Sequence, residues 1–276
     1  MHSAADDVIS APRRPRVIVG GLPFDHMTEA QAVAAVERGM LAGKGGWIVT
    51  PNIDIWLRTR REPECGELVA RADLVVADGM PLIWASRLAG TPLPQRVAGS
   101  TLVERLSDLA GRQGRAVYII GGGLGDTAER AGLALQQRYD GLRFVGAIAP
   151  EFGFEKDPAQ VGAIVDAVRA SGADLVLVGL GFPKQDRLAE QLCAQLPHVW
   201  ALGCGGGVAM AAGDAKRSPA WAQRLGVEWV VRLVQEPRRL AHRYLVDDAP
   251  AALVLLAQSL RRRLSGGRAA PQRSNG

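Results

Sequence analysis

Seven short apolar runs recur along the chain, and longer stretches with a helical spacing of apolar residues separate them. The runs are rich in Val, Ile and Leu, and most are bounded by Gly, Pro or Asp. This pattern predicts strands that are buried on both faces of a mainly parallel sheet. The predicted strands are Val17–Val19, Trp47–Thr50, Leu74–Ala77, Val117–Ile120, Phe144–Ile148, Leu175–Val178 and Val199–Gly203.

The stretches between these runs predict helices, the first of them with Thr28 as its N-cap. Helices that alternate with parallel strands indicate a layered α/β domain, with helices flanking the sheet. The predicted helices are Thr28–Leu41, Pro81–Ala89, Ser100–Gly111, Asp126–Tyr139, Pro158–Ser171 and Pro183–Leu196.

The pattern changes after Gly213. Within Pro219–Gln235 a Trp or Leu recurs every fourth residue, which predicts an amphipathic helix. Two more helices are predicted over Arg238–Val246 and Ala251–Leu264. The sequence thus predicts a disordered segment over residues 1–15, an α/β domain over 16–215, a basic helical appendage over 216–264 and a disordered tail over 265–276.

Composition is typical of a soluble globular protein, since 47% of the 276 residues are hydrophobic and 22% are charged. The three cysteines form no Cys-x-x-Cys pair, and together with four histidines they offer no zinc pattern, which fits a reducing cytoplasm. The N-terminal residues lack the apolar segment of a signal peptide, and no apolar run is long enough to span a bilayer. We therefore expect a cytoplasmic protein without a membrane-spanning segment.

Positive charge is concentrated at the C-terminal end. Residues 216–276 contain twelve Lys and Arg but four Asp and Glu, a net charge of +8, whereas the whole chain carries +5. Such a basic segment predicts contact with phosphate or with an anionic surface, either membrane or nucleic acid. It contains no recognisable nucleic-acid motif, so we expect a membrane surface rather than nucleic acid as the partner.

Polar side chains follow several of the predicted strands. Thr50 and Asn52 follow one strand, Asp78 follows the next, and Arg96 stands among turn-forming residues. In an open α/β sheet, residues just past the carboxyl ends of strands line the crevice where ligands bind. Each residue alone also has a simpler structural explanation: Asp78 can cap the following helix and Asn52 can shape a turn.

Three predicted strands lead into glycine clusters, whose free backbone amides suit phosphate oxygens at the start of a helix. The candidates for such contacts are Gly121, Gly122, Gly123, Gly179, Gly181, Gly205 and Gly206. All three clusters fail the dinucleotide fingerprint, because its third glycine would fall at Asp126, Lys184 or Val208. Tight-turn chemistry alone also explains any single cluster, but three in one sheet favour a nucleotide diphosphate site.

Lys184 and Gln185 follow Pro183 at the predicted start of a helix, where they can reach a diphosphate or a sugar hydroxyl. Lys184 alone is also explained as a solvated residue at a helix start. The sequence has no Asp-x-Asp pair to hold a metal with a nucleotide sugar. We therefore expect no metal and no cofactor. If the chemistry involves a diphosphate leaving group, protein cations and amides must stabilise it.

Seven blocks, in order, resemble the WecG/TagA/CpsF glycosyltransferases, and the resemblance covers about Arg16 to Val246. The blocks are Val19-Gly-Gly-Leu-Pro-Phe-Asp25 with Thr28-Glu-Ala, Thr50-Pro-Asn, Ala72-Asp-Leu with Ala-Asp78-Gly, Gln95-Arg-Val-Ala-Gly99, Gly179-Leu-Gly-Phe-Pro-Lys-Gln185, Leu225-Gly-Val-Glu-Trp229 and Gln235-Glu-Pro-Arg-Arg239. An ordered set of blocks is far more specific than any one of them.

The resemblance implies a Rossmann-like glycosyltransferase fold and an inverting reaction. In the reaction that the resemblance implies, a hexose or N-acetylhexosamine, such as glucose or N-acetylmannosamine, is transferred from a UDP-sugar to a polyprenyl-diphosphate-linked sugar, in assembly of a cell-surface polysaccharide or teichoic acid. It also implies a peripheral position on the inner face of the cell membrane and an arginine-bearing appendage that completes the active site. Whether the chain acts as a monomer or a homo-oligomer stays open.

By match of motif, Asp78 takes the place of the general base, and Thr50, Asn52, Arg96 and Gln185 take the places of polar active-site residues. Arg232, Arg238 and Arg239 lie in the matching part of the appendage, where they are candidates to bind the lipid diphosphate. The chain departs from the family in one place: Val208-Ala209 stands where members often carry Phe-Asp. This departure concerns the contacts to the donor.

Two other classes of function remain compatible with the pattern. The sheet and glycine loops also suit an NAD-linked oxidoreductase, although the failed fingerprints count against it. The basic C-terminal segment also suits a non-enzymatic module that binds an anionic surface.

Overall fold

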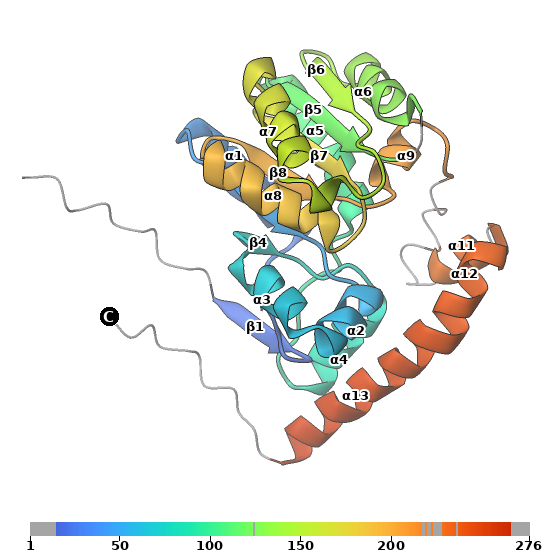
Figure 1. Ribbon diagram of the computed structural model, residues 1–276. Coiled ribbons are helices and arrows are strands. Elements are labelled where there is room, and N and C mark those ends of the chain that lie inside the picture. The colour runs from blue at the N-terminus through green and yellow to red at the C-terminus, as the bar shows by residue number, and fades with distance from the viewer. Residues whose placement is uncertain are drawn as a thin grey trace, which may run out of the picture.

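The computed structural model describes residues 15–123, 125–216, 219, 222, 228–235 and 237–265. They form an α/β domain with a long C-terminal helix along one side (Figure 1). The predicted disordered segments at the two ends lie almost wholly outside the described residues, as does most of residues 217–227.

A parallel sheet of six strands forms the centre of the domain, in the order β4-β3-β8-β7-β5-β6. Its strands are β3 (Gly46–Val49), β4 (Leu74–Val75), β5 (Ala116–Gly121), β6 (Arg143–Ile148), β7 (Leu175–Gly179) and β8 (Trp200–Gly203). The predicted mainly parallel sheet with flanking helices is therefore confirmed, and all six of these strands had been predicted. Because the strands are parallel, their carboxyl ends meet at one edge.

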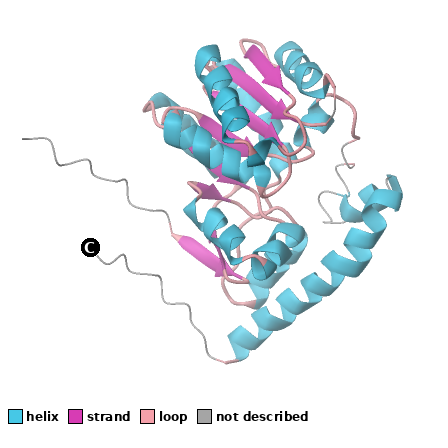
Figure 2. Ribbon diagram, in the orientation of Figure 1, coloured by secondary structure: helices cyan, strands magenta, loops and turns pink. Residues whose placement is uncertain are grey.

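Helices cover both faces of the sheet (Figure 2). On β5, Val117 and Ile119 pack into the core beneath one helical layer, while Tyr118 and Ile120 face the other layer, as the two-residue period of a strand requires. The first layer comprises α1 (Glu29–Leu41), α5 (Gly99–Arg112), α6 (Thr127–Arg138) and α9 (Gly207–Ala211). The second comprises α2 (Ile53–Arg61), α3 (Pro63–Arg71), α4 (Met80–Leu88), α7 (Pro158–Ser171) and α8 (Lys184–Gln195), with the short 3-10 helix η1 (Phe154–Lys156) before α7.

The first predicted strand does not join the sheet. It forms β1 (Arg16–Val19), which pairs antiparallel with β2 (Leu22–Asp25), a strand that had not been predicted. The two residues between them, Gly20 and Gly21, both have positive φ angles, of 59° and 92°. A Gly-Gly pair between short apolar segments is a hairpin turn signal, so the sequence did contain the evidence for this pairing.

The C-terminal helices pack beside the sheet domain. They are α11 (Glu228–Gln235), α12 (Pro237–His242), the π-helical segment η2 (Arg243–Asp248) and α13 (Ala249–Leu264). The described part of the first of these helices, α11, lies within its predicted range, whereas Trp221 and Leu225 of its predicted stripe lie outside the described residues. Leu255 of α13 is fully buried in the same core as Leu82 and Ile83 of α4. None of the described helices has the length and apolar character needed to cross a membrane.

Candidate active site

A cavity of about 1030 Å³ lies at the carboxyl edge of the sheet, where α4, η2 and α13 also approach. Its lining follows β3, β4, β5, β7 and β8, as expected for a ligand site in an open α/β sheet. Ten of the predicted site residues line this cavity: Thr50, Asn52, Asp78, Arg96, Gly122, Gly179, Gly181, Gln185, Gly205 and Gly206.

Asp78 is held by contacts from three segments. Its backbone N–H donates to the Pro51 carbonyl at 2.8 Å, which joins the chain after β4 to the chain after β3. Its carboxylate accepts a hydrogen bond from the Gly99 N–H at 3.3 Å and lies 3.5 Å from Arg96 Nη1. The N-cap of the following helix, α4, is Gly79, with φ of 128°, a conformation that favours glycine. Asp78 therefore binds the first residue of α5, and the N-cap position of α4 belongs to Gly79.

Arg96 connects Asp78 to the C-terminal helices. Its guanidinium lies 3.5 Å from Asp78 Oδ1 and donates to Glu228 Oε1 of α11 at 2.5 Å. The side chain is only 16% exposed. Burial opposes its charge, but the carboxylates of Asp78 and Glu228 outweigh burial and raise the pKa of Arg96. Glu228 was missed by the sequence reasoning because it is 132 residues from Arg96.

Thr50 and Asn52 fix the chain after β3. The Thr50 hydroxyl donates to the Gly203 carbonyl at 3.5 Å, so it contacts the end of the neighbouring strand β8. The Asn52 side chain accepts a hydrogen bond from the Ile55 N–H at 2.9 Å and caps α2. Asn52 thus has the local role that a turn-forming residue would have, and it also lines the cavity.

Gln185 joins two glycine loops. Its Oε1 accepts hydrogen bonds from the Gly181 N–H at 3.2 Å and from the Gly205 N–H at 3.0 Å. The residue is 4% exposed, so this amide is a fixed part of the cavity wall. The loops that follow β7 and β8 are therefore held side by side, with Gly179, Gly181, Gly205 and Gly206 in the cavity lining.

Three predicted substrate-binding residues lie outside the cavity lining. Gly121 is the buried last residue of β5, and Gly123 lies beyond Gly122 on an exposed turn. Lys184 pairs with Glu155 at 2.7 Å, with its Nζ 4.5 Å from the centre of the Phe152 ring. Lys184 points away from the cavity because the next residue of α8, Gln185, is buried against the sheet. This orientation of Lys184 was not evident from the sequence.

The predicted arginines of the appendage cannot be placed at the level of side chains. Arg232 belongs to α11, and Arg238 and Arg239 belong to α12, but their side chains lie outside the described part of the chain. Neighbours of these arginines do reach the cavity, since Glu228, Leu240 and Tyr244 are in its lining. The appendage thus contributes to the site.

Ala209, which with Val208 stands where the resemblance led us to expect Phe-Asp, also lines the cavity. The carboxylate of Asp214 also lies in the cavity lining. It is bound by Arg130 at 2.7 Å and by the Thr127 hydroxyl at 2.9 Å. These partners hold the pKa of Asp214 below its usual value. The departure of this chain from the family pattern therefore falls inside the site.

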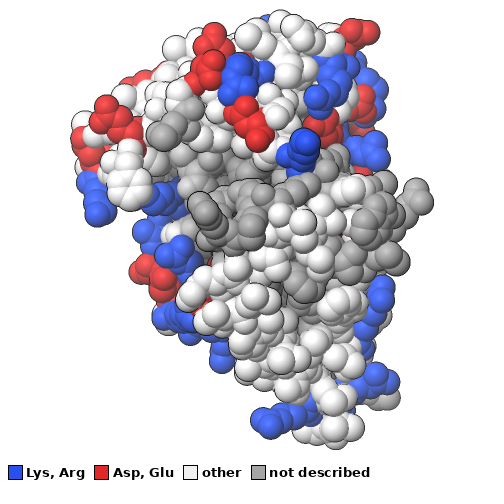
Figure 3. All heavy atoms as spheres, turned by 90° about the vertical axis from the view of Figure 1, so that its right-hand side faces the viewer, with Lys and Arg blue, Asp and Glu red and all other residues white. Residues whose placement is uncertain are grey.

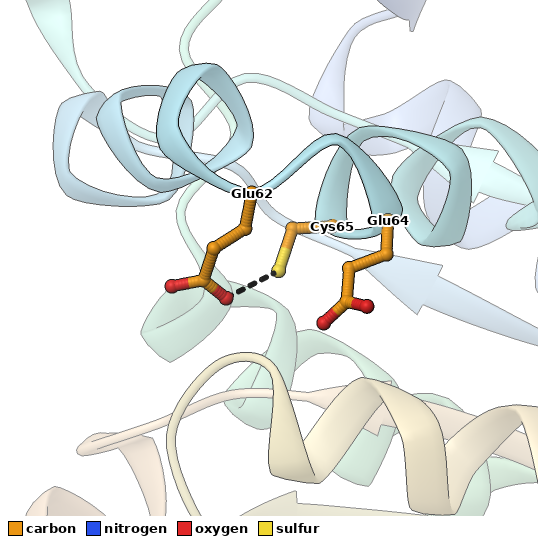
Figure 4. A group of neighbouring side chains, drawn as sticks. All are labelled: Glu62, Glu64 and Cys65. Carbon is orange, nitrogen blue, oxygen red and sulfur yellow. Dashed lines mark hydrogen bonds between the residues drawn. The ribbon is translucent and has the colours of Figure 1, made fainter.

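Glu62, Glu64 and Cys65 form the one group in the described parts of the chain with the spacing of metal ligands (Figure 4). The Cys65 thiol donates to Glu62 at 3.3 Å, and Arg58 and Arg187 pair with Glu62 and Glu64. Burial, with the neighbouring Glu62, raises the pKa of Cys65 to about 11. A neutral thiol beside carboxylates already paired with arginines is a poor metal site, and none of the three residues lines the cavity.

A parallel α/β sheet with glycine loops and a carboxylate–arginine pair at its carboxyl edge fits the class of nucleotide-dependent group transferases. The profile of the Glycosyl transferase WecG/TagA/CpsF family matches residues 17–265, and the chain belongs to this family. The N-acetylglucosaminyldiphosphoundecaprenol N-acetyl-beta-D-mannosaminyltransferase of Bacillus spizizenii (strain ATCC 23059 / NRRL B-14472 / W23) is 31% identical over 199 residues, which cover 71% of this chain and 74% of the relative. The chain is therefore a glycosyltransferase.

Proposed function

We propose that this enzyme transfers N-acetylmannosamine from a UDP-sugar to N-acetylglucosamine on a polyprenyl diphosphate, with inversion at the anomeric carbon. The name of the Bacillus spizizenii relative, an N-acetylmannosaminyltransferase that acts on N-acetylglucosaminyldiphosphoundecaprenol, supports the acceptor and the transferred sugar. The observation that carries the mechanism is the position of Asp78, beside Arg96 and opposite the glycine loops of one cavity.

Asp78 acts as the general base in this mechanism. Its carboxylate removes the proton of the acceptor hydroxyl while the oxygen attacks the anomeric carbon of the donor. The bond from that carbon to the diphosphate breaks, and UDP leaves with the electron pair. The Gly99 N–H and Arg96 stabilise the ionised carboxylate that a base requires.

The glycine loops surround the departing diphosphate. Gly122, Gly181, Gly205 and Gly206 let the backbone come close to the cavity, and Gln185 fixes two of these loops in place. Because the N–H groups of Gly122, Gly181 and Gly205 already donate to Gly179 or Gln185, we assign the developing negative charge, within this set, to the Gly206 N–H. We propose that the reaction is metal-independent, because both Asp78 and Glu228 already pair with Arg96.

An apolar wall accommodates the start of the prenyl chain. Met80 and Trp84, one turn apart on α4, face Leu253 and Leu256 of α13 in the cavity lining, and Trp84 and Leu253 are 41% and 68% exposed. Apolar side chains that remain exposed at the mouth of a polar cavity suit a ligand with a diphosphate and a hydrocarbon tail. The chain would then pass from Asp78 along α4 and α13 toward the membrane.

We propose that the protein attaches to the cytoplasmic side of a membrane through the face over α13. Its lower part carries few charged side chains except for Lys and Arg at its edge (Figure 3). Exposed apolar residues along this segment are Leu245, Val246, Leu253, Val254, Leu260 and Leu264, and the helix ends with Arg261, Arg262 and Arg263. Apolar residues with flanking cations are typical of helices that lie on an anionic bilayer.

A transfer assay tests the proposal. Purified protein is incubated with UDP-N-acetylmannosamine and a synthetic prenyl-diphosphate N-acetylglucosamine, and the disaccharide lipid is analysed by mass spectrometry and NMR. We expect transfer with inverted anomeric configuration, and undiminished transfer after chelation of divalent metals. Preferred use of UDP-glucose would correct the donor, and a retained anomeric configuration would contradict the role of Asp78.

A further inference from the structure

Asp186 follows Gln185 in the first turn of α8, and the residue is 1% exposed. Neither carboxyl oxygen makes a hydrogen bond of regular geometry with another described residue. A carboxyl group in such a place destabilises the fold, and an apolar side chain of similar size would not. Buried polar groups without regular partners require an explanation, which here lies next to the cavity.

Gly203 at the end of β8 leaves the space that Asp186 occupies. A Cβ atom on Gly203 would lie 2.8 Å from Asp186 Oδ1 and 2.8 Å from Gln185 Nε2. Both atoms therefore lie against the same point of the β8 backbone. Because Gly203 and Gln185 line the cavity, Asp186 is directly behind the cavity wall.

The hydrogen bonds of Gln185 show which way its amide faces. Its oxygen accepts from Gly181 and Gly205, so the nitrogen is on the other side of the amide. Burial raises the pKa of Asp186 to about 7, and hydrogen bonding with Gln185 acts in the opposite direction. Because this nitrogen and Asp186 Oδ1 lie against the same point of Gly203, the nitrogen is the part of the Gln185 amide nearest the Asp186 carboxylate.

We propose that Asp186 is a positioning residue: its carboxylate fixes the Gln185 amide so that one N–H of Gln185 is directed at a substrate oxygen in the cavity. A carboxylate only accepts hydrogen bonds, so it selects the nitrogen side of the amide. The inference rests on the proposed function, in which Gln185 lines the cavity that holds the substrates. Asp186 itself does not touch the substrate.

The titratable residues near Asp186 do not take over its contact with Gln185. Lys184 and Arg187, beside Asp186 on α8, pair with Glu155 and Glu64. The Cys204 thiol, in the loop after β8, donates to the Val178 carbonyl at 3.5 Å, and burial raises the pKa of Cys204 to about 12, so it remains neutral. The ionisation of Asp186 is therefore felt mainly by Gln185.

Thermal unfolding of Asp186→Leu tests the environment of the carboxyl group. The pKa of Asp186 in the folded protein, about 7, lies above the ordinary aspartate value of 3.8, so the native state loses stability as pH rises from about 4 to about 7. Asp186→Leu removes this loss, and its Tm should exceed that of the wild type by a margin that grows between pH 5 and pH 8. The exposed Asp166→Asn on α7 should show no such margin. A lower Tm for Asp186→Leu at pH 8 would overturn the inference.

Transfer kinetics test the positioning role. Although more stable, Asp186→Leu should lose about tenfold to a hundredfold in kcat/KM, the scale of a misplaced contact. Wild-type kcat/KM should rise as Asp186 ionises near pH 7, and Asp186→Asn should lack this rise. Wild-type rates in Asp186→Leu, or an unchanged pH profile in Asp186→Asn, would overturn the role of Asp186 alone. Absence of transfer by the wild type would instead overturn the proposed function, and with it this role.

Discussion

Asp78 is bound by a backbone N–H, a guanidinium and the chain after β3, so its carboxylate is held in one orientation. Asp78→Asn keeps the size and an acceptor oxygen but removes the base. We expect kcat to fall by about a hundredfold or more, since a positioned base contributes about 10²–10⁴-fold. Rates are measured with UDP-N-acetylmannosamine and the lipid acceptor, and calorimetry with UDP should give an unchanged Kd.

Asp166→Asn is the matched control for Asp78→Asn, because Asp166 is exposed on α7 and pairs only with its neighbour Arg169 among the interactions described for it. It should retain the wild-type rate. Near-normal turnover of a folded Asp78→Asn protein would remove Asp78 from the mechanism.

At the residue scale, the sequence predicted the polar groups that follow strands, because the carboxyl ends of parallel strands must meet. Thr50, Asn52 and Asp78 are brought together for this reason. Asp186 and Glu228 could not be predicted in the same way. The burial of Asp186 depends on the missing side chain of Gly203, and the pairing of Glu228 with Arg96 depends on how the appendage packs.

Between elements, the Arg96–Glu228 ion pair links α11 to the chain that precedes α5. Glu228→Ala removes one of the two carboxylates that pair with the mostly buried guanidinium of Arg96. We expect the free energy with which α11 packs on the sheet domain to become less favourable by about 1.5–3 kcal/mol, which is the usual contribution of a hydrogen bond to a charged group. Transfer should fall about tenfold, measured as kcat/KM for the lipid acceptor. Glu129→Ala on the exposed face of α6 is the control, and equal rates in the two variants would contradict a functional link.

The packing of α13 on α4 offers a second test between elements. Leu255 is fully buried and Leu264 is exposed on the same helix. Leu255→Ala should lower the free energy of unfolding by about 2–5 kcal/mol, because it opens a cavity in the core that α13 shares with α4. Hydrogen exchange of the α13 amides should accelerate with it.

Leu264→Ala should change the unfolding free energy and the exchange rates little, because its side chain leaves water only slightly on folding. If both leucine variants gave the same small change in urea unfolding, α13 would not be docked on α4 in solution.

The sequence predicted the positions of helices and strands better than it predicted which strands pair with each other. All six strands of the main sheet and most helices follow from apolar period and boundary residues. The run Val17–Val19 was correctly predicted as a strand but was assigned to the wrong sheet, because a run of three residues does not specify its pairing partner. The helices α2 and α3 were missed, although Asn52 as N-cap of α2 and Pro63 in the first turn of α3 mark their starts.

For the whole molecule, the uneven charge and the apolar face over α13 predict binding to anionic vesicles. Arg261 and Arg263 stand at the end of α13, next to exposed Leu260 and Leu264. Each basic residue near an anionic surface contributes about 1 kcal/mol, so Arg261→Gln with Arg263→Gln should weaken binding to phosphatidylglycerol vesicles about 30-fold. Flotation or tryptophan fluorescence measures the partition coefficient, and added salt should reduce it in the wild type.

Arg112→Gln with Arg169→Gln removes the same charge from α5 and α7 and serves as the matched control. Because these two arginines belong to the sheet domain, vesicle binding should stay near that of the wild type. Equal weakening in the two double variants would mean that net charge alone governs binding. Binding that is unaffected by salt and by lipid charge would mean that the apolar face acts without the arginines, and the end of α13 would then have no electrostatic role in bringing Asp78 to the lipid-linked acceptor.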